Sequence, residues 1–504
     1  MPEEILRLAM SVPVYDVAEE TPYEKAPLIS ARMRNNIWLK REDLQPVFSF
    51  KLRGAYARMS LLSDAEKKQG VVAASAGNHA QGVALSARKL GVEATIFMPL
   101  TTPNIKVEAV KCLGGKVVLE GDAYDEAAAA AQKYCEQNRA TFIPPYDDKN
   151  VIAGQGTIAL ELMRQGKNID IIFVPVGGGG LIAGIASVMK LVSPTTKIIG
   201  VEPEDAASMT KALAETKRVI LDTVGIFADG VAVKQVGKEP FRIAQTCVDE
   251  MITVKTDEIC AAVKDIFEDT RAIAEPAGAL ALAGMKKYVE EKSVSDLNMA
   301  VIVSGANMNF DRLRHISERT EIGEKKEALF AVTIDETPGS FKQFCELLGS
   351  RRSITEFNYR YGDDDKAIIF VGVRIEGGLA EKEQLVKQML SKGYDFADLS
   401  DNEVAKLHLR FMIGGKANGI SDELLYRFQF PERPGALLDF LSQISAKWNI
   451  SLFHYRNHGA AYGRILVGIQ VPSNEQKSFE DYLNKLDYPF ESEQDNVGYK
   501  LFLR

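Results

Sequence analysis

The stretch IIFVPVGGGGL, residues 171–181, indicates the fold of the larger part of this chain. Its first six residues are apolar without polar alternation, which is typical of a parallel strand covered by helices on both faces. Four consecutive glycines carry a large cost in backbone entropy, so they indicate a turn whose amides approach another group closely. A helix is expected to begin near Leu181. This order predicts an α/β fold with a ligand at the turn.

The same alternation extends over the first three hundred residues. Short apolar runs alternate with longer, alanine-rich stretches of helical spacing, and they lie at residues 70–74, 94–98, 116–119, 169–176, 197–202 and 299–304. This alternation predicts a doubly wound α/β domain.

The composition excludes several classes of protein. With 504 residues, 46% hydrophobic and 26% charged, the chain is expected to form two or three soluble globular domains. A net charge of -8 with dispersed lysines and arginines argues against nucleic acid as a partner. We find neither an export signal nor an apolar run of about 18 residues, so we expect no membrane partner. The five cysteines are widely spaced, which predicts buried thiols in a cytoplasmic protein without a metal site.

A boundary and a repeat divide the rest of the chain. Residues 317–327 carry seven charges in eleven positions, and the apolar pattern lapses there. Beyond them, Pro338-Gly339 recurs as Pro434-Gly435 and Tyr359-Arg360 as Tyr455-Arg456, each 96 positions later. We therefore predict domains at residues 1–320, 327–414 and 422–504.

Each copy of the repeat is expected to be a small α+β module. The first copy has the pattern of a strand at 329–334, a Pro-Gly turn, a helix at 340–349, and strands at 354–361 and 367–375, before a further helix and strand. This order resembles the ferredoxin-like amino-acid-binding modules called ACT domains, although a plain scaffold could share it. The resemblance implies that an amino acid binds where the first strand meets the first helix. The candidate allosteric residues are Asp335, Pro338 and Gly339 in the first copy, and Pro431, Pro434 and Gly435 in the second.

Two more segments of the first domain carry candidate chemistry. Residues 49–55, SFKLRGA, contain a lysine that could bond to a ligand or merely be solvated at a helix start. Residues 75–79, SAGNH, follow the predicted strand at 70–74, and their small side chains leave amides free for an anion such as a carboxylate. A tight turn capped by Asn78 is the alternative.

The glycine turn alone also fits a different class of enzyme. Gly178-x-Gly180-x-x-Ala183 satisfies the relaxed dinucleotide fingerprint, and Glu202 ends the next predicted strand at nearly the distance that ribose binding requires. A nicotinamide-dependent dehydrogenase is therefore an alternative. It would need a glycine fingerprint near the chain start and a hydride-site His or Lys, and neither is evident.

Taken together, the three segments resemble the fold type II, tryptophan synthase β-like pyridoxal-phosphate enzymes, and specifically the serine/threonine dehydratases. Residues 275–279, EPAGA, and residues 304–307, SGAN, match the same family. The resemblance extends to about residue 320, and it implies pyridoxal 5'-phosphate as the cofactor.

The resemblance also implies roles for individual residues. Lys51 bonds to the cofactor and removes the substrate α-proton, while Ser304 faces the ring nitrogen as the second catalytic residue. Phe50 packs on the ring, and Asn78 bonds the 3-hydroxyl. The phosphate is held by Gly177, Gly178, Gly179, Gly180 and Leu181, and the substrate carboxylate by Ser75, Ala76, Gly77, Asn78 and His79. The acid that protonates the leaving hydroxyl is expected to be the cofactor phosphate, with His79 as the alternative.

The subfamily depends on other features. Gln45-Pro46 and the SAGNH segment differ from the Asn-Pro and Thr-Ser-Gly-Asn typical of O-acetylserine sulfhydrylases. The duplicated tail resembles that of biosynthetic threonine dehydratases. This resemblance implies elimination of water from L-threonine to give 2-oxobutanoate and ammonia, with L-serine as a secondary substrate. It further implies feedback inhibition by isoleucine, opposition by valine, and a homotetramer. A serine dehydratase or racemase stays the nearest alternative; a non-catalytic amino-acid sensor is disfavoured by the intact Lys51 segment.

Overall fold

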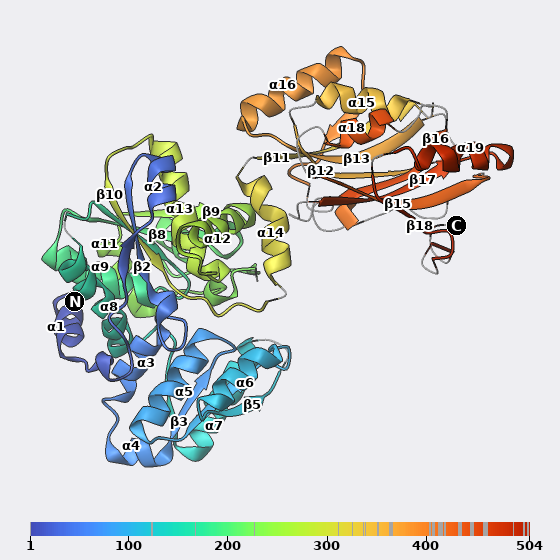
Figure 1. Ribbon diagram of the computed structural model, residues 1–504. Coiled ribbons are helices and arrows are strands. Elements are labelled where there is room, and N and C mark those ends of the chain that lie inside the picture. The colour runs from blue at the N-terminus through green and yellow to red at the C-terminus, as the bar shows by residue number, and fades with distance from the viewer. Residues whose placement is uncertain are drawn as a thin grey trace. The chain divides into compact units, whose positions relative to one another are not determined.

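The computed structural model describes residues 2–121, 124–166, 168–225, 227–310, 312–324, 326–335, 337, 339–349, 352–361, 366–402, 405, 409–411, 417, 420–431, 436–443, 448–456, 462–486, 488–496, 499–500 and 503. The chain forms two compact units, Met1–Gly323 and Glu324–Arg504. In Figure 1 the first unit runs from blue to yellow and the second from yellow to red.

The first unit is built on a six-stranded sheet. Its order is β1 (Tyr23–Lys25), β2 (Asn36–Arg41), β10 (Asn298–Val303), β7 (Ile171–Pro175), β8 (Lys197–Pro203) and β9 (Glu250–Val254). All neighbours are parallel except β1, which pairs antiparallel with β2. Every residue of β7 is buried, as its unbroken apolar run predicts.

Helices cover both faces of this sheet. Phe173 and Val301 pack into one core with α12 (Thr256–Thr270) and α13 (Pro276–Lys292). Their neighbours Ile172 and Ile302 pack into the opposite core, with α8 (Lys149–Gln165), α9 (Gly180–Val192) and α11 (Lys238–Cys247). The alternation of side chains between two helical layers confirms the doubly wound prediction for this sheet.

Three of the predicted strands do not continue the large sheet. β3 (Val71–Ala74), β4 (Ala94–Met98) and β5 (Lys116–Leu119) form a separate four-stranded sheet with β6 (Thr141–Phe142), in the order β5-β4-β3-β6. This segment, inserted between β2 and β7, has its own core beneath α5 (Asn78–Leu90) and α6 (Asn104–Cys112). Periodicity predicts strands but carries no information on which strands pair, so the sequence did not reveal the division.

The parallel strands bring the candidate motifs to one place. The glycine turn follows β7, residue 304 follows β10, and residue 75 follows β3. Since ligands of α/β sheets bind at the carboxyl ends of strands, the two sheets together define the site.

The second unit is one eight-stranded antiparallel sheet. Its order is β14 (Phe396–Asp398), β11 (Glu327–Asp335), β13 (Lys366–Arg374), β12 (Ile354–Arg360), β16 (Asn449–Arg456), β17 (Tyr462–Gln470), β15 (Glu423–Pro431) and β18 (Phe490–Ser492). The first copy adds α15 (Ser340–Leu348) and α16 (Gly378–Ser391), and the second adds α18 (Ala436–Gln443) and α19 (Gln476–Leu483).

The two copies join at their equivalent strands. β12 pairs antiparallel with β16, so that Tyr359 lies opposite Phe453. One apolar core contains side chains from all four helices and from both halves of the sheet. The element order in each copy confirms the α+β, ACT-like fold.

The cysteines differ in part from the prediction. All five are free thiols, but Cys112 is exposed and Cys135 is only partly buried. Cys112 ends α6 at the protein surface, which a count of cysteines does not reveal. Throughout the described part of the chain, no helix combines the length and apolarity that crossing a membrane requires.

Candidate active site

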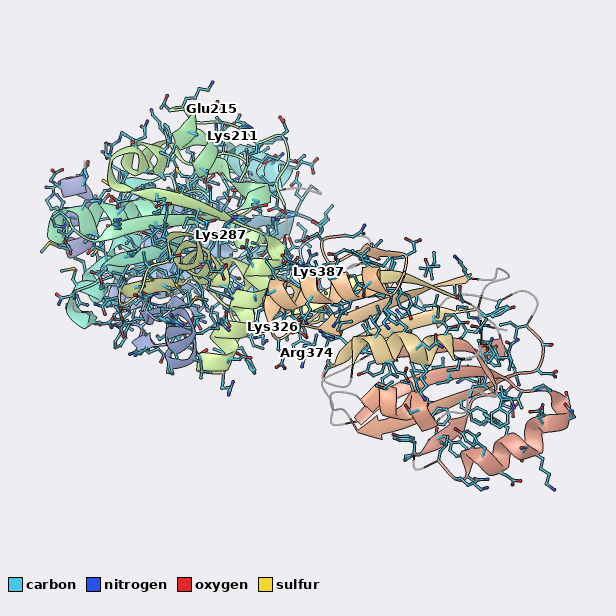
Figure 2. The ribbon with its side chains drawn as sticks, turned by 90° about the horizontal axis from the view of Figure 1, so that it is seen from above. Lys211, Glu215, Lys287, Lys326, Arg374 and Lys387 are labelled. Carbon is cyan, nitrogen blue, oxygen red and sulfur yellow. The ribbon has the colours of Figure 1, made fainter. Side chains whose placement is uncertain are left out.

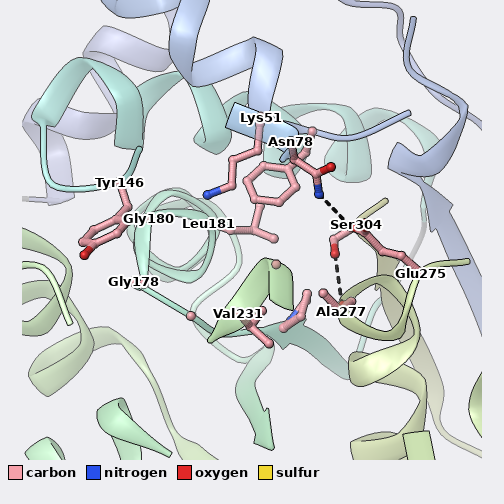
Figure 3. A pocket seen from close by; sticks show the side chains of 15 residues that line it. Lys51, Asn78, Tyr146, Gly178, Gly180, Leu181, Val231, Glu275, Ala277 and Ser304 are labelled. Atoms are coloured by element: carbon pink, nitrogen blue, oxygen red, sulfur yellow. Dashed lines mark hydrogen bonds between the residues drawn. The ribbon is translucent and has the colours of Figure 1, made fainter. Parts of the chain in front are cut away.

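One pocket in the first unit brings together the cofactor motifs (Figure 3). Its lining comes from segments spread over 255 positions of the chain: Phe50, Lys51, Asn78, Tyr146, Pro175, Gly177, Gly178, Gly179, Gly180, Leu181, Gly230, Val231, Glu275, Ala277 and Ser304. All predicted cofactor-binding residues are therefore in this pocket.

Lys51 is the first residue of α3 (Lys51–Met59), which places its amine at the helix start. Its Nζ lies 3.4 Å from the Pro145 carbonyl oxygen and 5.3 Å from the centroid of the Phe50 ring. Burial lowers the pKa of Lys51 to about 8, although the Glu275 charge opposes this effect. An appreciable neutral fraction near neutral pH suits an amine that acts as a nucleophile and base.

The glycine turn forms a cradle that other residues would fill. A Cβ added to Gly178 would lie 2.2 Å from the Tyr146 ring, and one at Gly177 would lie 2.9 Å from Val231 Cα. Gly179 has a φ of +91°, a conformation that residues with a Cβ rarely adopt. The turn ends at the N-terminus of α9, where free amides and the helix dipole favour an anion. The cradle therefore fits the cofactor phosphate.

Ser304 lies at the end of β10 and is 4% exposed. Its hydroxyl donates to the Ala277 carbonyl oxygen at 3.2 Å, and its side chain faces the pocket (Figure 3). The hydroxyl proton can rotate from the Ala277 carbonyl oxygen toward the pocket, so this buried neutral group fits a ring nitrogen that is left unprotonated.

Of the SAGNH segment, Asn78 is in the pocket lining and His79 is buried, whereas Ser75, Ala76 and Gly77 are half-buried and outside that lining. Asn78 lines the pocket, and Ser75 accepts a hydrogen bond from the Gly77 amide at 3.3 Å. His79 is turned away, because its Nε2 lies 2.8 Å from the Ile143 carbonyl oxygen. Burial and the Lys51 charge lower the pKa of His79 to about 3, so the imidazole is neutral at physiological pH. A neutral, internally bonded imidazole is poorly suited to protonate a leaving hydroxyl.

Glu202 does not have the place that dinucleotide binding requires. Its carboxylate is buried and accepts hydrogen bonds from the amides of Met209 and Thr210 at 2.7 and 2.8 Å, at the start of α10 (Ser208–Ala214). The carboxylate thus caps a helix outside the pocket lining, and this removes the support for the dehydrogenase alternative.

Sequence reasoning missed several lining residues. Tyr146 lies in a loop, and Gly230 and Val231 lie in a short 3-10 helix. Neither segment has a recognisable motif, so only their packing reveals their place. Glu275 was part of a matched motif, but no role was predicted for it. Its side chain is 3% exposed and reaches the pocket beside Asn78.

Comparisons with known proteins agree with this geometry. Residues 14–305 match the family model for pyridoxal-phosphate dependent enzymes, and residues 318–409 and 414–503 match the C-terminal regulatory domain of threonine dehydratase. The biosynthetic L-threonine dehydratase IlvA of Pasteurella multocida (strain Pm70) is 54% identical over 501 residues, which are 99% of this chain and 97% of that protein.

Solved structures resemble the first part of the chain. The processed form of threonine deaminase isoform 2 from Solanum lycopersicum has a TM-score of 0.62 and 51% identity, covering 63% of this chain and 93% of that chain. Maize serine racemase has a TM-score of 0.58 and 32% identity, covering 62% of this chain and 95% of that chain.

Proposed function

The chain belongs to the biosynthetic threonine dehydratases, a family of pyridoxal-phosphate-dependent lyases, and on this premise we propose how its own residues carry the reaction. The reaction is the β-elimination of water from L-threonine, which gives 2-oxobutanoate and ammonia and commits carbon to isoleucine biosynthesis. The observation that carries the proposal is the single pocket in which the Lys51 amine, the glycine cradle and Ser304 meet.

Each part of the pocket has a task. Lys51 would hold the cofactor through Nζ, residues 177–181 would hold its phosphate, and Phe50 would lie against its ring. When bound, pyridoxal phosphate supplies an electron sink for the charge that develops at the substrate Cα. Lys51 Nζ then takes the proton from that carbon, and its lowered pKa makes it a competent base.

The substrate is held by the SAGNH segment. Its backbone amides at the start of α5 would bind the threonine carboxylate, which orients the Cα proton toward Lys51. His79 supports this turn from within by its bond to Ile143 and takes no part in proton transfer.

A direct assay tests this function. The purified protein with pyridoxal phosphate is expected to convert L-threonine to 2-oxobutanoate, and L-serine to pyruvate with a lower kcat/KM. The resemblance to a serine racemase motivates a parallel assay for D-serine. D-serine formation faster than 2-oxobutanoate formation would contradict the assignment.

Replacement of Ser304 by Asp is expected to slow elimination by at least about tenfold and to raise side transamination. A carboxylate beside the ring nitrogen favours its protonated form, which spreads charge into the ring and slows expulsion of the hydroxyl. The measurement is the ratio of 2-oxobutanoate to pyridoxamine phosphate. Ser304→Ala, which stays neutral, is the matched control and should keep the wild-type ratio. An unchanged ratio in Ser304→Asp would show that Ser304 does not face the ring nitrogen.

We place the effector sites at the strand-to-helix turns of the second unit. In the first copy, Asp335 ends β11, and Gly339, with a φ of +96°, precedes α15. The Asp335 carbonyl oxygen accepts from the Thr337 amide at 2.9 Å, which shapes a tight turn. In the second copy Pro431 ends β15. Pro338 of the first copy and Pro434 and Gly435 of the second lie outside the described residues. The regulatory-domain match supports amino-acid effectors, for which isoleucine and valine are our candidates.

Truncation after Gly323 is expected to leave an active core that isoleucine no longer inhibits. All residues of the pocket precede this point, whereas the proposed effector turns follow it. Coupling between separate sites is typically about 1 to 3 kcal/mol, so saturating isoleucine should lower the threonine affinity of the full chain by at least about fivefold and should leave that of the truncated core unchanged. A core that is folded and as sensitive as the full chain would place the effector site in the first unit.

Two full-length variants control for indirect effects of truncation. Gly339→Ala and Gly393→Ala both place a Cβ on a left-handed backbone with nothing within 4 Å, but only Gly339 belongs to a proposed effector turn. Isoleucine sensitivity should fall in the first variant and persist in the second. We further propose that the protein is cytoplasmic and forms a homotetramer, in which large exposed apolar side chains such as Phe310 would be covered. Light scattering run beside these assays tests the homotetramer.

A further inference from the structure

Glu275 is a buried carboxylate in the active-site pocket for which the mechanism above has no role. It precedes α13, and its backbone amide donates to the Gly305 carbonyl oxygen at 3.1 Å. Figure 3 shows its side chain directed at Asn78. Buried carboxylates cost free energy unless they are paired or hydrogen-bonded, so this position requires an explanation.

A chain of hydrogen bonds joins Glu275 to two asparagines. Asn78 Nδ2 donates to Glu275 Oε1 at 2.6 Å, and Asn307 Nδ2 donates to Asn78 Oδ1 at 2.7 Å. Asn307 Nδ2 also donates to the Val47 carbonyl oxygen at 2.7 Å. Both polar atoms of the Asn78 amide are therefore held, and a 180° flip of that amide would break both bonds. The second N–H of Asn78 is then fixed in direction.

Two glycines lie close to the Glu275 carboxylate. A Cβ added to Gly305 would lie 2.5 Å from Glu275 Oε1, and one at Gly230 would lie 3.7 Å from it. The carboxylate thus lies near both the short helical segment that carries Gly230 and the segment after β10 that carries Gly305. A side chain at position 305 would collide with the carboxylate.

Charged groups from three elements act on Glu275. Asp229, in the short helix η4 (Asp229–Val231), opposes its ionisation, whereas Lys106 of α6 and Lys51 of α3 favour it. Burial is the largest effect and raises the pKa of Glu275 to about 7. Above neutral pH the ionised carboxylate is a strong acceptor for the Asn78 amide.

We propose that Glu275 is a positioning residue that, together with Asn307, orients the Asn78 amide so that its second N–H meets the 3-oxygen of the bound cofactor. This inference rests on the proposed function, because it requires that the cofactor occupies the pocket with its ring beside Asn78. Glu275 itself acts only through Asn78.

A double-mutant cycle at pH 8 tests the proposal on the full chain. Glu275→Ala is expected to weaken pyridoxal phosphate binding by at least about tenfold and to change the ratio of the absorbance bands of the bound cofactor. Glu275→Gln, which keeps an acceptor oxygen, should stay within about threefold of the wild type. In an Asn78→Ala background, Glu275→Ala should change the affinity by less than about twofold, because the group through which it acts is gone.

The controls separate this role from general stabilisation. Glu202→Gln removes another buried carboxylate whose pKa burial raises to about 7, but Glu202 lies outside the pocket lining, so cofactor affinity should not change. If Glu275→Ala does not fold, Asn307→Ala removes the opposite anchor and should alter the spectrum in the same way, again only when Asn78 is present. Full effects of these substitutions in the Asn78→Ala background would overturn the proposal.

A further measurement distinguishes failure of this inference about Glu275 from failure of the proposed function. Reduction of the holoenzyme with borohydride followed by peptide mass spectrometry reports whether the cofactor is bonded to Lys51. Attachment at Lys51 combined with additive effects of Glu275 and Asn78 would refute this inference alone. Absence of attachment would refute the assignment of the pocket.

Discussion

Lys51→Ala is expected to reduce threonine turnover by at least about 10⁴-fold and to abolish covalent attachment of the cofactor. One amine serves both as the bond to the cofactor and as the base for the α-proton, so a single substitution removes two functions. Lys51 is the only lysine in the pocket lining as described, and its pKa, lowered to about 8, is suited to both roles.

The measurements are kcat for 2-oxobutanoate formation and the mass of the borohydride-reduced peptide that contains residue 51. Lys211→Ala is the control, since Lys211 is an exposed residue of α10 (Figure 2). The control should retain wild-type activity and attachment. Attachment in Lys51→Ala, with more than a trace of turnover, would assign the role to a different lysine.

Arg53→Met is expected to lower the free energy of unfolding of the first unit by about 3 to 5 kcal/mol. Arg53 is fully buried, and its guanidinium contacts Glu42 at 2.8 Å and Glu161 at 2.6 Å. Its removal leaves Glu42 buried without its cation, while Glu161 keeps its 2.5 Å pair with Lys40 and the hydrogen bond from the Tyr15 hydroxyl. An uncompensated buried charge costs far more than a lost surface contact.

The change in the free energy of unfolding caused by Arg53→Met is best measured with a spectroscopic probe that reports on the first unit alone. The two tryptophans are Trp38 in the first unit and Trp448 in the second, so a Trp448→Phe background makes fluorescence report on the first unit alone. Arg164→Met is the matched control, because the Arg164–Glu20 pair is about half exposed at both ends, with 52% and 43% side-chain exposure. Arg164→Met should lower the free energy of unfolding by less than about 1 kcal/mol. Equal effects of the two substitutions would show that the buried network contributes no special stability.

The ion pairs of Arg53 with Glu42 and Glu161 also affect catalysis, because Arg53 lies in the same helix as Lys51. Arg53 follows Lys51 by two residues in α3. A Cβ added to the next residue, Gly54, would lie 2.3 Å from Gln155 Nε2 of α8. The ion pairs and the tight packing of α3 against α8 therefore fix the helix that carries the lysine. Partial loosening in Arg53→Met would be visible as a fall in cofactor affinity before unfolding.

Much of the fold could be predicted because its strands, turns and repeated modules follow from residue types at fixed spacings in the sequence. The unbroken apolar run of β7 and the glycine turn after it predicted a buried parallel strand and an anion cradle, and the 96-position repeat predicted two modules of one kind. The division into two sheets could not be predicted, since strand pairing depends on which apolar faces pack together.

In the candidate site, too, some features could be predicted from local sequence and others depended on tertiary packing. The motifs around Lys51, the glycine turn and Ser304 were recognisable from local sequence, and with them the family, the cofactor and the reaction. Packing was needed to show that His79 turns toward Ile143, that Glu202 caps a helix, and that Glu275 reaches Asn78 from 197 positions away. The physical reason is that a motif specifies backbone conformation over a few residues, whereas the direction, charge state and partner of a side chain depend on segments that only the folded chain brings within hydrogen-bonding distance.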